Sequence, residues 1–119
     1  MSFKPLPIKP TIQFPDFDKI DIRVGKIEEV QDIEKSNKLV RLIVDFGDFK
    51  RTILAGIKKE REDIKELEGK QSLFVVNLEP KEIMGEMSEG MLFAIGYENE
   101  IKAVLAQPEE NVPEGSRAS

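Results

Sequence analysis

Short runs of alternating apolar and polar residues constrain this chain more than any other feature. Two of them, LVRLIVDF over Leu39–Phe46 and FKRTILA over Phe49–Ala55, are joined through Gly47 and Asp48. Alternation with a period of two is typical of strands that bury one face, and a glycine-containing join predicts a hairpin. We therefore expect antiparallel β-structure over both ranges.

The same reasoning extends along the chain. A strand is expected to begin at Ile20, and its alternation shifts phase after Gly25, which a glycine bulge would explain. The residues Glu60–Glu68 are poor strand formers and precede Gly69, so we expect a short helix with a glycine C-cap. Further strands are predicted over 72–78, 91–97 and 101–106, the last two joined through residues 98–100.

Three strands, a short helix and then further strands are the order of an OB-fold, an all-β, five-stranded Greek-key barrel. Residues 1–16 are predicted to be an extended arm, because they contain four prolines among apolar residues. We expect this arm to pack along its own domain or across a partner subunit. Residues 17–119 are expected to form the OB-fold domain with a C-terminal extension.

The absence of three residue types excludes most familiar chemistry. The chain of 119 residues contains no Cys, no His and no Trp. Thiolate nucleophiles, imidazole bases and Cys/His zinc sites are therefore excluded. Carboxylate, Lys, Ser and Tyr97 chemistry remains open, but no spacing among these residues indicates a substrate. We predict a protein without catalytic residues, metal or cofactor.

Charge is distributed unevenly along the chain, although the net charge is −5. Residues 35–59 contain seven basic and two acidic residues, whereas residues 79–114 contain two basic and nine acidic residues. A basic strand pair suits contacts with phosphates, which supply affinity and position rather than sequence choice. An ordinary charged sheet face explains the same pattern, and the sequence leaves both readings open.

The stretch VNLEPKEIMGEMSEGML, Val76–Leu92, holds three of the four methionines. Gly85 and Gly90 would break a helix, so we predict a glycine-bent loop over Glu79–Gly90. The methionines either fill gaps in the core or pack against the apolar faces of a partner. Composition alone does not decide between these two roles.

Several ordered motifs in the chain resemble those of the tRNA-binding domain family. They are KLVRLIVDFG, RTILAGI, VVNLEPKEIMG, SEGML and a closing P-x-x-x-x-P-x-G, and together they span roughly residues 17–116. That family includes free-standing tRNA-binding proteins, C-terminal domains or β subunits of methionyl-tRNA synthetases, and CsaA proteins described as export chaperones.

The resemblance implies a non-catalytic OB-fold homodimer that binds tRNA by shape at the corner of the L, as an auxiliary to methionyl-tRNA synthetase. The alternative is a CsaA-type chaperone that binds unfolded polypeptide. No run is long and apolar enough for a membrane span, and we expect a cytoplasmic protein. The resemblance implies RNA-binding roles for Arg23, Lys38, Arg51, Asn77, Lys81, Ser88, Glu89 and Met91, and the basic stretch adds Arg41 and Lys58.

Some residues depart from the family pattern. Ala55 stands where many relatives have Ser, and Glu82 and Glu86 stand where relatives often carry Arg or Lys. These changes predict a weaker attraction for RNA, because each phosphate contact that is lost lowers affinity.

Overall fold

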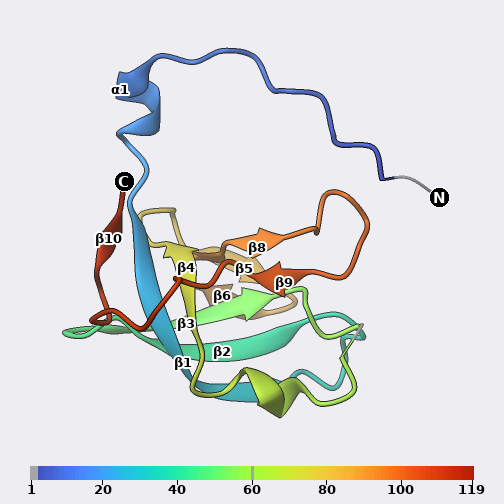
Figure 1. Ribbon diagram of the computed structural model, residues 1–119. Coiled ribbons are helices and arrows are strands. Elements are labelled where there is room, and N and C mark those ends of the chain that lie inside the picture. Colours follow the sequence, from blue (N-terminus) through green and yellow to red (C-terminus); the bar gives the residue numbers. More distant parts are fainter. Residues whose placement is uncertain (1–2, 60) are drawn as a thin grey trace.

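A computed structural model describes residues 3–59 and 61–119 of the chain. It consists mostly of short antiparallel strands that curl into a nearly closed barrel, as the sequence predicts for an OB-fold (Figure 1). The elements in chain order are α1 (Phe14–Phe17), β1 (Ile22–Asp32), β2 (Val40–Asp45), β3 (Lys50–Ala55), the 3₁₀ helix η1 (Ile64–Leu67), β4 (Gln71–Val75), β5 (Lys81–Ile83), β6 (Glu86–Ser88), β7 (Met91–Leu92), β8 (Ala94–Ile95), β9 (Val104–Leu105) and β10 (Arg117–Ala118).

The strand β1 organises the barrel, because it pairs with three neighbours. The sheet order is β3-β2-β1-β4-β7, and β10 pairs with the beginning of β1. The first half of β1 pairs with β4 over 22–26, and its second half pairs with β2 over 26–32. One long strand that changes partner midway must bend, and this bend brings the two ends of the sheet toward each other.

The bulge in β1 lies three residues beyond the predicted position. The register with β2 shifts between Ile27 and Glu29, whereas Gly25 stays in regular pairing with Ser72. Gly25 has a different role: a Cβ placed there would lie 2.4 Å from Cγ1 of Val44. Gly25 therefore allows β1 to lie close to Val44 in the core. Glu28 is the extra residue of the bulge.

Alternating residues of β1 to β4 fill the barrel. The rings of Phe46 and Phe74 are almost completely buried and meet edge to face, with centroids 5.5 Å apart. Phe49 stacks on the ring of Phe46, with centroids 5.1 Å apart. Such aromatic pairs add packing energy to the burial of their apolar area. Phe46 and Phe74 belong to the buried core, and the partly buried Phe49 packs against it.

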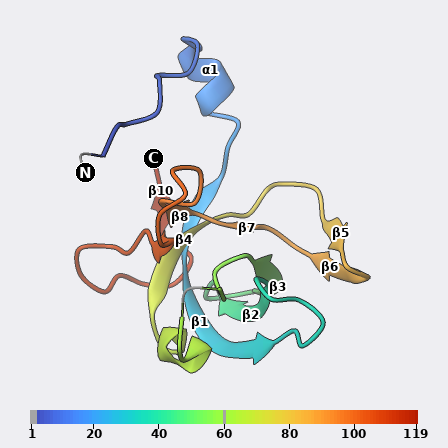
Figure 2. The same ribbon diagram turned by 90° about the vertical axis from the view of Figure 1, so that its right-hand side faces the viewer.

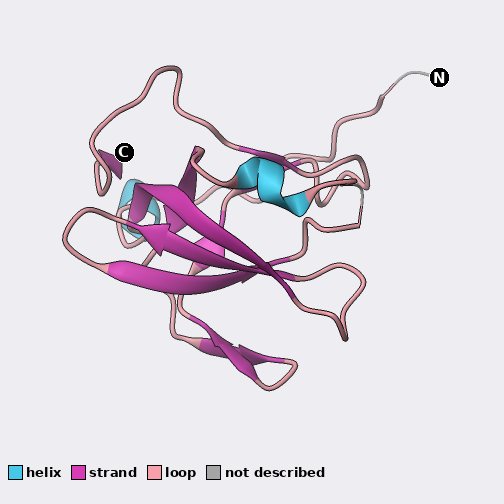
Figure 3. Ribbon diagram, turned by 90° about the horizontal axis from the view of Figure 1, so that it is seen from below, coloured by secondary structure: helices cyan, strands magenta, loops and turns pink. Residues whose placement is uncertain are grey.

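Two predicted segments differ from the structure. The helix expected over Glu60–Glu68 is a single 3₁₀ turn over Ile64–Leu67, and Glu60 lies outside the described residues. Gly69 follows the turn with a φ of 87°, but it is not the predicted cap, because Glu68 before it is extended and the Gly69 amide donates to the Ile27 carbonyl at 2.7 Å. The loop expected over Glu79–Gly90 contains the hairpin β5–β6, which stands out from the barrel (Figures 2 and 3).

The strands predicted after Ser72 are shorter than expected. The segment 91–97 contains β7 and β8, which are separated at Phe93, and only Val104–Leu105 of the last predicted strand is paired. The predicted pairing of these two segments is confirmed by β8 and β9. Brief strands suit a barrel rim, where strong curvature interrupts the ladder.

The N-terminal arm runs clear of the barrel, and every residue over 3–20 is exposed (Figure 1). It is extended as predicted except at α1, a four-residue helix. Pro15 lies in the first turn of α1, where a missing N–H costs no intrahelical hydrogen bond. Within residues 3–59 and 61–119, no helix combines the length and apolar character needed to cross a membrane.

We predict that Gly25→Ala lowers the free energy of unfolding by about 1–3 kcal/mol, because the new methyl would overlap Val44 and Phe46. Gly56→Ala is the control, since its Cβ would meet Tyr97 at an ordinary 3.6 Å. Urea denaturation of both variants measures the difference. Equal stabilities for the two variants would contradict the close-approach role of Gly25.

Candidate nucleic-acid interface

Four lysines gather where the loop after β1 meets the segment that follows β3. Lys35, Lys38, Lys58 and Lys59 line a shallow hollow there, together with Ser36, Asn37, Arg61, Met84 and one acidic residue, Glu34. We call this surface the lysine hollow. Lys35, Lys38 and Lys59 are exposed, and no ion pair engages them in the part of the chain that the structure describes.

Lys58 is held within the fold. Its Nζ donates to the carbonyl oxygens of Ser36 at 2.8 Å and Ile33 at 3.2 Å, and it forms an ion pair with Asp32. These contacts fix the loop that carries Lys35 and Lys38. Lys58 therefore shapes the hollow, while its neighbours project their charge into solvent.

Arg41, on β2, connects the barrel to the projecting hairpin. Its guanidinium donates from Nε to Oε1 of Glu86 at 2.7 Å and from Nη1 to Oε1 of Gln31 at 2.8 Å. The carboxylate of Glu86 thus neutralises the charge of Arg41 and links β6 to β2. The sequence predicts that Glu86 weakens the attraction for RNA, but in the fold the guanidinium of Arg41 largely compensates the charge of Glu86.

The Ser88-Glu89-Gly90 segment closes the free edge of β3. The Ser88 hydroxyl accepts a hydrogen bond from the Leu54 amide at 3.0 Å and donates to the Gly90 carbonyl at 3.0 Å. The Glu89 carboxylate accepts from the Thr52 amide at 2.9 Å, and the Glu89 amide donates to the Thr52 carbonyl at 2.8 Å. Side-chain oxygens therefore satisfy edge N–H groups that would otherwise be unpaired.

Arg51 reinforces the same closure. Its Nη1 donates to the carbonyl oxygens of Glu89 at 2.9 Å and Val76 at 3.1 Å. The guanidinium carbon lies 5.1 Å from the centroid of the Phe49 ring, within cation–π range. This side chain joins β3 to the two segments that flank the hairpin.

Arg23 and Asn77 meet at Asp21, just before β1. Asp21 accepts from Nε of Arg23 at 3.1 Å and from Nε of Arg117 at 3.2 Å, which ties β10 to β1. The hydrogen bond from Arg23, with a second from Arg117, holds the pKa of the Asp21 carboxyl below its usual value. Asn77 accepts from the Asp21 amide at 2.8 Å and donates to the Lys19 carbonyl at 2.7 Å.

The predicted site residues thus divide into two groups. Lys38, Lys81 and Met91 are exposed and point out of the fold. The others make hydrogen bonds within the fold, and Ser88 is buried. The structure brings Lys38 and Lys58 together in one hollow and places Lys81 on the hairpin. Lys35 and Lys59 were not predicted as site residues, although the density of lysine over 35–59 is the signal that includes them.

Comparison with known proteins identifies the family to which this domain belongs. The family described as "Putative tRNA binding domain" matches residues 22–117. The chain belongs to this tRNA-binding domain family. Among curated proteins, it is 42% identical over 109 residues to a methionine–tRNA ligase of Archaeoglobus fulgidus, covering 92% of this chain and 16% of that protein. A second, from Methanothrix thermoacetophila, is 47% identical over 107 residues, covering 90% and 15%.

Solved structures of small proteins match along their whole length. The chain superposes on a MetRS-related protein from Pyrococcus horikoshii with a TM-score of 0.84 and 39% identity, covering 93% of this chain and 100% of that one. The chaperone CsaA of Bacillus anthracis gives a TM-score of 0.80 and 28% identity, covering 92% and 100%. The tRNA-binding domain therefore matches the ligases over about a sixth of their length and these small proteins over all of it.

We predict that Ser88→Ala lowers the free energy of unfolding by about 1–3 kcal/mol, because the buried Leu54 amide loses its acceptor. Ser116→Ala is the control, since that hydroxyl bonds the Pro113 carbonyl at an exposed position. Chemical denaturation measures both. A Ser88→Ala variant of unchanged stability would contradict the edge-closing role of the hydroxyl.

The Asp21 contacts predict a pH dependence of stability. The folded-state pKa of Asp21 lies below its unfolded value of about 4, so the carboxylate stabilises the fold above that pH. This contribution is lost as the pH falls through the folded-state pKa. Asp21→Asn should cost about 0.5–1 kcal/mol at pH 7 and markedly less at pH 3, by urea denaturation. A cost that is independent of pH would argue against the ion pairs.

Proposed function

We propose that this protein is a non-catalytic, structure-specific tRNA-binding protein that acts as a homodimer in the cytoplasm and assists a methionyl-tRNA synthetase. The observation that carries this proposal is the lysine hollow on a domain whose family is described by tRNA binding. The similarity to methionine–tRNA ligases and to a MetRS-related protein supports the link with that synthetase.

The chemistry of the surface favours recognition by shape. Exposed lysines contact phosphate oxygens, which fix the position of an RNA but carry no direct sequence information. We propose that the hollow binds the backbone at the corner of the L-shaped tRNA, and that Lys81 extends the contact along the hairpin. Met91, which is 45% exposed, offers an adaptable apolar surface to a base or ribose.

The remaining predicted residues are proposed to act through the shape of this surface. Arg41 sets the angle of the hairpin through Glu86, and Lys58 fixes the lysine-bearing loop. Arg51, Ser88 and Glu89 hold the barrel edge from which the hairpin projects. Arg23 and Asn77 position the strand β1 and the residues before it.

A filter-binding titration with unfractionated tRNA at two salt concentrations tests the proposal. The double variant Lys38→Gln/Lys59→Gln should weaken binding several-fold at low salt. It should also reduce the slope of log affinity against log salt by about 0.7–0.9 for each lost phosphate contact. Lys70→Gln is the control, because this exposed lysine lies outside the hollow.

The two lysine changes remove charge without touching the core, so folding should be unaffected. If the parent protein retains no tRNA even at low salt, the proposed function is wrong. If Lys70→Gln weakens binding as much as the double variant does, the attraction is general and the hollow is not the site.

A chaperone function is the second candidate. Met84 and Met87 are 45% and 51% exposed at the tip and side of the hairpin, and flexible thioethers suit varied apolar partners. Solved structures of the CsaA chaperones of Bacillus anthracis and Picrophilus torridus share the fold at 28% and 33% identity. If this function holds, the protein suppresses aggregation of an unfolded client, and Met84→Ser/Met87→Ser abolishes the effect.

A further inference from the structure

The turn of the β5–β6 hairpin holds a methionine in a backbone conformation that does not suit it. Ile83 pairs with Glu86, so Met84 and Gly85 form a two-residue turn, and their φ values are 51° and 81°. Positive φ at both central positions is characteristic of a type I′ turn, in which Asn-Gly and Asp-Gly are preferred. Methionine has no polar group for a local hydrogen bond, and its Cβ crowds the backbone in this conformation.

Packing in the core does not explain the methionine either. The side chain of Met84 is 45% exposed. Its neighbour Ile83 instead packs against the small buried cluster of Ile33, Leu39 and Leu54, and so fixes the hairpin to the barrel. Backbone strain at an exposed position is typical of residues whose side chains serve a function, because the fold alone would favour another residue there.

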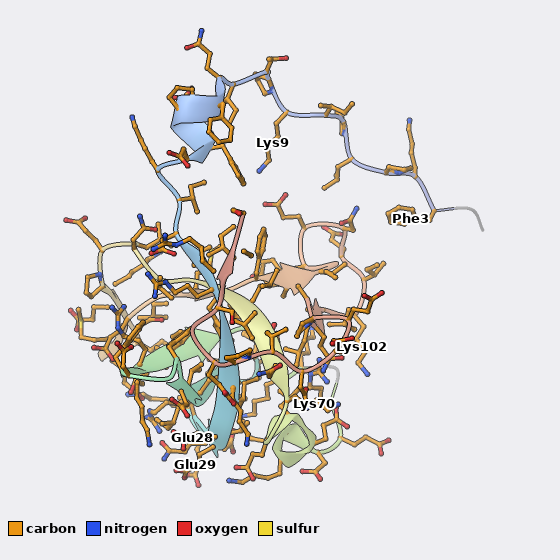
Figure 4. All side chains as sticks on the ribbon, turned by 60° about the vertical axis from the view of Figure 1, so that its left-hand side comes forward. Phe3, Lys9, Glu28, Glu29, Lys70 and Lys102 are labelled. Carbon is orange, nitrogen blue, oxygen red and sulfur yellow. The ribbon has the colours of Figure 1, made fainter. Side chains whose placement is uncertain are left out.

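Met84 lines the lysine hollow. Among the described residues that form the hollow, it is the only one with a large apolar side chain, since the others are charged or polar. The N-terminal arm, which carries Phe3 and Lys9 in Figure 4, contributes none of these residues. The hollow therefore combines exposed ammonium groups with one thioether on a single surface.

Contacts within the fold hold both sides of this surface in place. The ion pair of Arg41 with Glu86 links the hairpin to β2. On the other side, the side chain of Arg61 is 6% exposed and donates to the carbonyl oxygens of Ile57 at 3.1 Å and Ala103 at 2.9 Å. The segment that carries the lysines after β3 is therefore fixed, and a ligand need not order it on binding.

A nucleotide whose base is turned out of its stack matches this combination of groups. Lysine side chains contact phosphate oxygens, whereas a thioether makes favourable contacts with aromatic rings. In an A-form duplex the bases are stacked, and the narrow major groove keeps side chains away from them. Loops and bends of a structured RNA expose base faces beside their phosphates. A surface that contacted phosphates alone would gain nothing from Met84.

We propose that Met84 packs against the face of one unstacked base of the tRNA, while the neighbouring phosphates lie against the lysines of the hollow. Every base has a flat apolar face, so this contact selects an unstacked nucleotide and not a particular base. The proposal rests on the tRNA binding of the proposed function and names the feature of the RNA that the hollow recognises.

Met84→Asn tests the proposal, because asparagine suits the turn but lacks the thioether. In filter binding with unfractionated tRNA at low salt, its affinity should fall about fivefold, the lower end of what a stacked base contributes. The slope of log affinity against log salt should stay unchanged, since no charge is lost. The urea midpoint should be no lower than that of the parent, because the strained residue has been replaced.

Two further variants separate contact with a base from an effect on the hairpin. Met84→Leu keeps an apolar side chain and should retain most of the affinity. Met87→Asn is the matched control, since Met87 is 51% exposed on β6 and does not line the hollow, and its affinity should equal that of the parent. Glycine also accepts a positive φ, so Met84→Gly repeats the test if Met84→Asn fails to fold.

A continuous duplex, poly(A)·poly(U), is the second probe. The parent and Met84→Asn should bind it equally, because its bases stay stacked. An equal loss of affinity for the duplex and for tRNA would overturn the proposal, and so would an equal loss in Met87→Asn.

The proposal and the proposed function fail in different ways. A parent protein that retains no tRNA would reject both. A parent that retains tRNA, with unchanged affinity in Met84→Asn, would reject only the contact with a base. If Met84→Asn keeps its affinity for tRNA but no longer protects an unfolded client, Met84 contacts polypeptide and the proposal is overturned.

Discussion

The closure of the β3 edge is the contact on which the rest of this structure depends. In the described part of the chain, the sheet order β3-β2-β1-β4-β7 leaves β3 and β7 as unpaired ends, so a gap lies between them. Here the gap is bridged by the hydroxyl of Ser88 and the carboxylate of Glu89, which accept hydrogen bonds from two amides of β3. Without these acceptors, the edge would expose or bury unsatisfied N–H groups, and both outcomes are costly.

The closure also determines which charges remain available to a ligand. Arg51 and Glu89 form hydrogen bonds at the closed edge of β3, and Arg41 forms an ion pair with Glu86 nearby. The lysines at the end of the barrel are not drawn into this network, because other contacts fix their loop: Lys58 donates to its backbone carbonyls, and the Ser36 hydroxyl accepts from its amides. A chain with net negative charge therefore presents a local basic surface, and local charge controls association with phosphate.

Much of the fold could be predicted from local pattern. Alternation predicted the strands around Leu42 and Ile53, and Gly69 predicted the end of a helical turn, because these signals depend on neighbouring residues only. The β5–β6 hairpin was missed, since its strands are three residues long and its turn places Met84 at a φ of 51°, a conformation that non-glycine residues seldom adopt. The bulge was misplaced because Gly25 serves packing and not register.

By itself, the sequence determined the fold class, the family and the concentration of lysine over 35–59, since these follow from residue types and spacing. Only the tertiary structure decided how the candidate residues are used. Ser88, Glu89 and Arg51 bond to residues that lie 25 or more positions away in the chain, and no local pattern reports such a contact. Polar groups on distant segments form hydrogen bonds with each other only when the barrel closes. The closed barrel therefore decides which polar residues are bonded within the fold and which are exposed.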